Sequence, residues 1–235
     1  MGNTMNTGTV WLGIDIGSTT AKMVALDPAG EVAFSAYRRH NTETLASLQA
    51  LLDETLQALG DASVHLRLTG SAGLGLCEKF HLPFIQEVIA SAEAVRGLNA
   101  QAVETGRRPL STLMDIGGED AKLIFFDGGQ PDIRMNGACA GGTGAFIDQM
   151  ATLLNVPIGE LNTLAAQSGT VHPIASRCGV FAKTDVQNLL SRDTPRTDIA
   201  ASIFNAVVFQ TLATLARGHQ IRPVVLFAGG PLRDR

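Results

Sequence analysis

The chain has 235 residues, 45% hydrophobic and 17% charged, which is the composition of a globular protein with a buried core in one large or two small lobes. A net charge of −4 without a lysine/arginine cluster argues against a nucleic-acid partner. The sequence has no run of 18 uninterrupted apolar residues, so a membrane span is not expected. Residues 1–8 lack the pattern of a signal peptide and the three cysteines are widely spaced, so a cytoplasmic protein without a disulfide framework is expected.

The first part of the chain predicts a βββαβα order. Leucines recur at helical spacing over 43–59, and apolar residues alternate over 63–69. The expected strands are 10–16, 20–27, 30–37 and 63–69, and the expected helices are 43–59 and most of 83–105. The segment Arg107-Arg108-Pro109 marks the expected boundary between a first lobe, 1–108, and a second lobe, 109–235.

The second lobe restarts the same pattern. Its expected strands are 110–116, 120–127, 131–135 and 224–227, and its expected helices are 144–154, 158–168, 180–191 and 197–217. A buried strand followed by Gly229-Gly230 normally leads into a helix that packs back on the sheet. We therefore expect the second lobe to be incomplete, as in one segment of a longer polypeptide.

One octet occurs twice, and its two copies align without a gap. The copies are Asp15-Ile16-Gly17-Ser18-Thr19-Thr20-Ala21-Lys22 and Asp115-Ile116-Gly117-Gly118-Glu119-Asp120-Ala121-Lys122. Each is typical of a strand, a tight glycine turn and a second strand. Small residues in the bend let backbone N–H groups approach a phosphate, and the aspartate can hold the accompanying Mg²⁺ through water. The repeat favours two related lobes facing one ligand over two unrelated hairpins.

Four segments carry a resemblance to a known superfamily. The two octets, Cys139-Ala140-Gly141-Gly142-Thr143-Gly144 and Phe227-Ala228-Gly229-Gly230 stand in the order of the phosphate-1, phosphate-2, connecting and adenosine motifs of the acetate kinase/sugar kinase/Hsp70/actin superfamily. Within it the chain resembles the activators of 2-hydroxyacyl-CoA dehydratases and the ATPase subunits of benzoyl-CoA reductases, in particular the activase domain that opens long fused members. The resemblance implies an α/β fold of duplicated ribonuclease H-like lobes with a nucleotide cleft between them.

The resemblance also implies site residues. Asp15 and Asp115 would be the Mg²⁺-side carboxylates, and Glu119 stands where the dehydratase activators usually carry a glutamine, near the hydrolytic water. The residues expected to bind ATP or ADP are Gly17, Ser18, Thr19, Thr20, Gly117 and Gly118 at the phosphates, Gly142 and Gly144 beside the nucleotide, Asp148 near the ribose, and Gly229 and Gly230 at the adenosine. Lys22 and Lys122 are interpreted as surface-strand lysines.

The resemblance further identifies Cys139 and Cys178 as ligands of a 4Fe–4S cluster. Such a cluster takes about four thiolates, and two copies of the chain in a homodimer supply these two cysteines twice. Each precedes an expected helix, whose partially positive N-terminus favours a thiolate. Cys77 matches no family position and is interpreted as a buried thiol, and the five histidines as structural.

The leading hypothesis is an ATPase that drives one electron from the shared cluster into an acyl-CoA dehydratase or reductase component, which could be the rest of a fused polypeptide. Two alternatives remain open at the level of sequence. One is a small-molecule kinase of the same superfamily without iron, and the other is a non-catalytic nucleotide-binding module of a fused protein.

Overall fold

The computed structural model describes residues 8–127, 129–136, 141–176 and 178–230. The chain forms two compact units, residues 1–94 and 95–235. The division falls inside a helix, α3 (Glu87–Glu104), and not at the Arg-Arg-Pro segment where the sequence analysis put it. The reason is packing, because Val95 of α3 is buried against Leu113 and Ile124 of the second unit.

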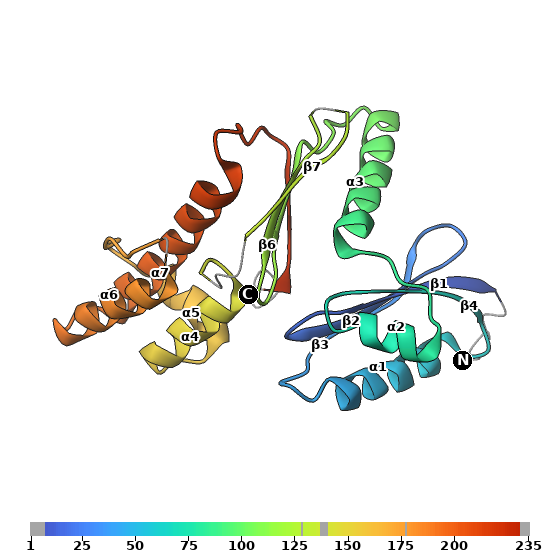
Figure 1. Ribbon diagram of the computed structural model, residues 1–235, viewed down its shortest axis with the longest axis horizontal. Helices are drawn as coiled ribbons and strands as arrows, with labels where there is room; N and C mark the ends of the chain where they lie inside the picture. The colour runs from blue at the N-terminus through green and yellow to red at the C-terminus, as the bar shows by residue number, and fades with distance from the viewer. Residues whose placement is uncertain (1–7, 128, 137–140, 177, 231–235) are drawn as a thin grey trace. The chain divides into compact units, whose positions relative to one another are not determined.

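The first unit is a four-stranded sheet with helices on one face (Figure 1). Its elements are β1 (Thr9–Ile16), β2 (Thr20–Leu26), β3 (Val32–Arg39), α1 (Thr44–Leu59), β4 (Ser63–Thr69) and α2 (Leu74–Phe80). The strand order is β3-β2-β1-β4, with β1 antiparallel to β2 and parallel to β4. Alternate residues of β1, starting at Val10, are buried under α1 and α2 together with Leu51 and Cys77.

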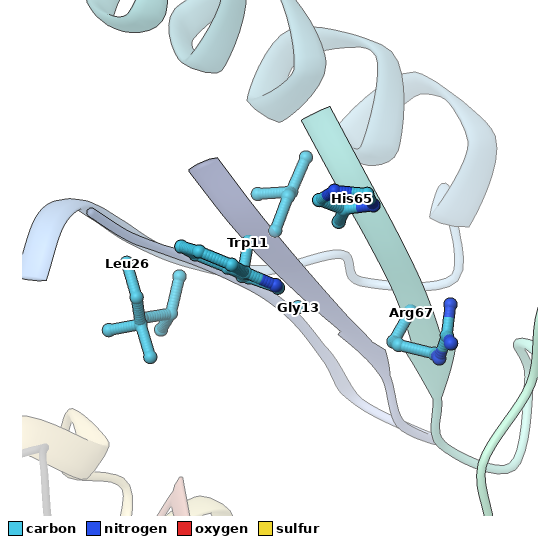
Figure 2. Close-up of a pocket in the computed structure, with 7 residues that line it drawn as sticks. Trp11, Gly13, Leu26, His65 and Arg67 are labelled. Atoms are coloured by element: carbon cyan, nitrogen blue, oxygen red, sulfur yellow. The ribbon is translucent and has the colours of Figure 1, made fainter. Parts of the chain in front are cut away.

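The opposite face of this sheet carries a shallow hollow of about 410 Å³. Figure 2 shows the rings of Trp11 and His65, which come from the paired strands β1 and β4 and stack with centroids 5.9 Å apart. Gly13, Leu26 and Arg67 line the same hollow.

The second unit repeats the sheet of the first and adds a layer of helices (Figure 1). Its elements are β5 (Thr112–Ile116), β6 (Ala121–Phe125), β7 (Asp132–Met135), α4 (Gly144–Leu154), α5 (Ile158–Ala165), α6 (Gly179–Ser191), α7 (Arg196–Thr211), a π-helical turn η1 (Leu212–Ala216) and β8 (Val225–Ala228). The strand order β7-β6-β5-β8 has the same pairing directions as β3-β2-β1-β4. The predicted duplication of an α/β lobe is therefore confirmed.

The helices α4 to α7 share a core of their own, to which Met150, Val186 and Ile203 each contribute a fully buried side chain. Among the described residues, the helical stretch Arg196–Ala216 is long and apolar enough to cross a membrane by length and composition. Half of its apolar window is buried in the protein, as in the core helix of a globular fold.

One element was not expected from the sequence. The short helix α2 begins after Gly73 and ends at Phe80, and His81, which follows it, adopts a left-handed conformation. Its residues were not predicted as a helix because Gly73 and Gly75 lower helix propensity at its start. Burial of the apolar side chain of Leu76 and of Cys77 against the sheet outweighs that propensity.

Candidate functional site

Asp15 lies near the end of β1 and faces Lys22 across the β1–β2 ladder. The Lys22 Nζ is 2.5 Å from Asp15 Oδ2, and the lysine side chain is 32% exposed. The bend between the two strands is closed by the Gly17 N–H, which donates to the Thr20 carbonyl at 2.9 Å. Ser18 and Thr19 form the half-buried tip of this bend, and the first copy of the octet thus forms a carboxylate beside a compact backbone turn.

The second copy builds the same arrangement, but with its lysine and its strand-end aspartate buried. Asp115 faces Lys122 across the β5–β6 ladder, and the Gly117 N–H donates to the Asp120 carbonyl at 2.8 Å. The Lys122 side chain is only 2% exposed, with Nζ 3.0 Å from Asp120 Oδ2 and 3.8 Å from Asp115 Oδ2. The interpretation of Lys122 as a surface lysine is wrong, because β6 lies between β5 and β7 and all five of its residues are buried.

A glycine after the parallel strand completes each half. Gly70 follows β4 and Gly229 follows β8, both with positive φ. A Cβ on Gly70 would overlap the Ile16 carbonyl and come within 2.5 Å of Asp15 Oδ1, and a Cβ on Gly229 would overlap the Ile116 carbonyl. Gly229 was predicted at the site, whereas Gly70 was not. The signal for Gly70 is its place directly after a strand, which matches the place of Gly229 in the other unit.

The bend between β5 and β6 is hydrogen-bonded to the start of α4. The Gly144 N–H donates to the Gly117 carbonyl at 2.9 Å, and the Ala145 N–H donates to the Gly118 carbonyl at 2.7 Å. The structure therefore brings the predicted residues Gly117, Gly118 and Gly144 together.

Gly142, which precedes α4, has φ +83°, and a Cβ there would lie 2.9 Å from Gln210 Cγ. Because of this contact, the glycine-rich segment packs closely on α7, where only a residue without a side chain fits.

Cys178 is the residue directly before α6, as predicted, and is half-buried. A narrow crevice beside it is lined by Gly141 and Gly142 of the glycine-rich segment and by Phe146 of α4. Phe146 also lies close to the start of α6, since a Cβ on Gly179 would lie 3.6 Å from its ring. Cys139 lies outside the described residues, and among those described no three histidine, cysteine or acidic side chains gather as a metal site.

The structure also describes the remaining residues that were predicted at the site. Thr20 is buried at the start of β2, and Glu119 is exposed at the tip of the second bend. Asp148 is half-buried on α4, and Gly230 follows Gly229. Away from these bends, Cys77 is buried in the core of the first unit, where desolvation, together with the charge of Glu78, raises the pKa of its thiol.

Two related α/β lobes, each with an aspartate at a strand end, a glycine bend and a glycine after the parallel strand, define an ATPase of the actin/Hsp70/sugar-kinase fold. The sequence profile of the BadF/BadG/BcrA/BcrD ATPase family matches residues 12–235, and the chain belongs to that family.

The comparison with known proteins agrees over nearly the whole chain. The (R)-2-hydroxyglutaryl-CoA dehydratase activating ATPase of Acidaminococcus fermentans is 30% identical over 219 residues, which cover 93% of this chain and 82% of the relative. The activator of lactoyl-CoA dehydratase of Anaerotignum propionicum is 31% identical and covers 93% of this chain and 82% of the relative. The structure of the activator of the 2-hydroxyisocaproyl-CoA dehydratase from Clostridium difficile with bound ADPNP superposes with a TM-score of 0.77 and 28% identity, covering 96% of this chain and 81% of that one.

Proposed function

We propose that this ATPase is a cytoplasmic activase that couples ATP hydrolysis to the transfer of one electron into an acyl-CoA dehydratase or a related reductase. Its relatives include activators of 2-hydroxyglutaryl-CoA and lactoyl-CoA dehydratases, which supports an acyl-CoA dehydratase as the class of partner. A 4Fe–4S cluster bound by the cysteines would supply the electron, and an external one-electron donor would restore it. ATP and water would become ADP and phosphate in each cycle.

The observation that carries the proposal is a chain of contacts inside the second unit. The carbonyls of Gly117 and Gly118 accept hydrogen bonds from the first N–H groups of α4. Phe146, in the first turn of α4, packs on Gly179 beside Cys178. A displacement of the phosphate-2 bend would thus reach the thiol through one helical turn and one aromatic ring. Hydrolysis can do work through this path only if ATP and ADP favour different positions of the bend.

The residues of the two half-sites suit a magnesium nucleotide. The carboxylates of Asp15 and Asp115 are hard oxygen ligands of the kind Mg²⁺ takes, usually with several waters retained. The bends at Gly17 and Gly117 offer backbone N–H groups with little side-chain bulk over them. In this proposal the phosphates are also lined by Ser18, Thr19, Thr20 and Gly118. The nucleotide further contacts Gly142 and Gly144, with Asp148 near the ribose and with Gly229 and Gly230 flanking the adenosine. Glu119 would orient the hydrolytic water.

The thiol site suits a cluster shared between two subunits. Cys178 caps the N-terminus of a 13-residue helix, where the helix dipole favours a negatively charged sulfur. In the first turn of that helix, Val180 and Phe181 are 72% and 65% exposed, so two large apolar side chains are exposed within three residues of the thiol. We propose that a second copy of the chain covers these side chains and brings its own Cys139 and Cys178 to complete the four thiolates.

Iron analysis of protein purified without oxygen tests the proposal. We expect a brown protein with about four irons per dimer, and the loss of iron in Cys178→Ala. Cys77→Ala is the matched control, because this thiol is buried elsewhere, and it should keep its iron. A wild-type protein that hydrolyses ATP but holds no iron would instead favour a kinase of the same fold.

A further inference from the structure

His40 is buried beside the phosphate-1 bend. It follows β3 directly and is 5% exposed. Its Nε2 lies 3.2 Å from the Gly17 carbonyl oxygen, and its backbone N–H donates to the Thr19 carbonyl at 3.1 Å. On the far side of the ring, Nδ1 lies 3.5 Å from Thr44 Oγ1, in the first turn of α1. One residue therefore contacts two of the three residues of the bend and the helix behind it.

The contacts determine which ring nitrogen carries the proton. A carbonyl oxygen can only accept, so Nε2 must be the donor toward Gly17. In the neutral ring Nδ1 is then an acceptor, which suits a proton from the Thr44 hydroxyl. Toward the bend His40 acts as a hydrogen-bond donor, a role that an amide side chain can also fill.

Holding the Gly17 carbonyl sets the direction of the next N–H group. The Gly17–Ser18 peptide bond is trans, so its C=O and the Ser18 N–H point in opposite directions across the same plane. With the carbonyl directed at His40, the Ser18 N–H points away from the ring. That N–H is the group with which a bend of small residues binds an anion.

The backbone after His40 is held in a disfavoured conformation. Asn41 and Thr42 have φ of +46° and +71°, the left-handed region that residues with a Cβ seldom adopt. Two such residues in succession persist only where the surroundings fix them, and such positions gather at functional sites. The segment between β3 and α1 thus keeps the imidazole against the bend despite this unfavourable geometry.

We propose that His40 is a positioning residue for the phosphate-binding bend, acting through the Gly17 carbonyl to aim the Ser18 N–H at a nucleotide phosphate. The inference rests on the proposed function, since it requires nucleotide at this bend. It needs neither the cluster nor the partner enzyme. The ligand chemistry concerned is a nucleoside diphosphate or triphosphate.

Calorimetric titration of the full chain with magnesium ADP and with adenosine tests the inference. His40→Leu removes the donor and keeps the bulk, and should weaken ADP binding about tenfold, the effect of one lost hydrogen bond, while adenosine binding stays unchanged. His40→Gln restores an N–H donor and should recover most of the ADP affinity. His65→Leu, on the open face of the same sheet, is the control and should bind as the wild type does.

The outcomes separate the two claims. A wild-type protein that does not bind ADP would contradict the proposed function, whereas a His40→Leu protein that binds ADP like the wild type would overturn the inference alone. An equal loss for ADP and adenosine would also overturn it, because it would indicate general damage. If His40→Leu does not fold, Thr44→Val decides: weaker ADP binding supports the positioning role, and unchanged binding refutes it.

Discussion

Lys122 lies opposite Asp115 on neighbouring strands, in the same register in which Lys22 lies opposite Asp15. The two pairs differ in their surroundings, because Lys122 is enclosed in a sheet covered on both faces and Lys22 is partly open to water. The same sequence repeat has thus placed one ion pair partly open to solvent and one with its lysine in the interior.

Lys122→Met should therefore destabilise the protein strongly. It removes this cation from the buried carboxylate of Asp115 and from the partly exposed carboxylate of Asp120, and a buried carboxylate that loses its cation typically costs about 3–5 kcal/mol of the free energy of unfolding. Lys22→Met is the matched control, with a loss of about 1 kcal/mol or less, because an ion pair that is partly open to solvent contributes little. Urea unfolding of both variants measures the difference. Equal losses of unfolding free energy in the two variants would contradict the expected effect of burial on the Lys122 ion pairs.

Gly70→Ala and Gly229→Ala should each unfold more readily and bind ADP poorly. A methyl group at either position overlaps the carbonyl of Ile16 or Ile116, and both glycines have a positive φ that alanine disfavours. Gly97→Ala, in the middle of α3 with no atom near the added carbon, should instead gain up to about 1 kcal/mol. Thermal unfolding and ADP titration of the three variants measure these effects. If Gly70→Ala has the stability and the ADP affinity of Gly97→Ala, the backbone at Gly70 does not approach the Ile16 carbonyl as closely as described.

The Asp198 carboxylate makes stability depend on pH. Hydrogen bonds from the Gly169 N–H, and further from the Thr170 N–H and the Ser168 hydroxyl, hold the pKa of Asp198 below its usual range against a smaller opposing effect of desolvation. A carboxyl whose folded pKa is depressed stabilises the protein above its unfolded pKa, near 4, and this stabilisation is lost as pH falls through the folded value.

Asp198→Asn should therefore be less stable than the wild type at pH 7, with the difference shrinking as pH falls below about 4. Asp53→Asn, on an exposed position of α1, is the control and should show no such trend. Unfolding by denaturant across this pH range gives the comparison. If the difference in unfolding free energy between Asp198→Asn and the wild type stays constant with pH, the lowered pKa of Asp198 is contradicted.

Phe146→Leu should separate nucleotide binding from its effect on the thiol site. The ring is the part of α4 that lies against Gly179. A smaller side chain leaves a gap at this place and keeps the hydrogen bond of Gly144 to the bend unchanged. We expect ADP affinity close to that of the wild type, with a weaker nucleotide effect on the environment of Cys178. Titration with ADP and the rate of Cys178 alkylation, in a background of Cys77→Ala and Cys139→Ala, measure the two properties. If ADP changes the alkylation rate of Cys178 as much in Phe146→Leu as in the protein with Phe146, the path from the bend to the thiol through this ring is refuted.

The duplicated octet was enough to predict the two sheets and the strand ends that carry Asp15 and Asp115, since alternation and glycine turns are local signals. The burial of Lys122 was not predicted, because it depends on β7 and the helices that cover β6. The roles of Gly70 and His40 depend on which segments fold against the bend, and no spacing along the chain encodes that. The position of Cys178 before α6 was predicted because a helix start is also a local signal.

The central claim is that the nucleotide controls the environment of a cluster held by Cys139 and Cys178. The most direct measurement is the rate at which an iron chelator removes iron from anaerobic protein, compared between a non-hydrolysable magnesium ATP analogue and magnesium ADP. The account predicts that the two nucleotides give different rates and that Phe146→Leu narrows the difference. Identical rates in the wild-type protein, with both nucleotides shown to be bound, would contradict it.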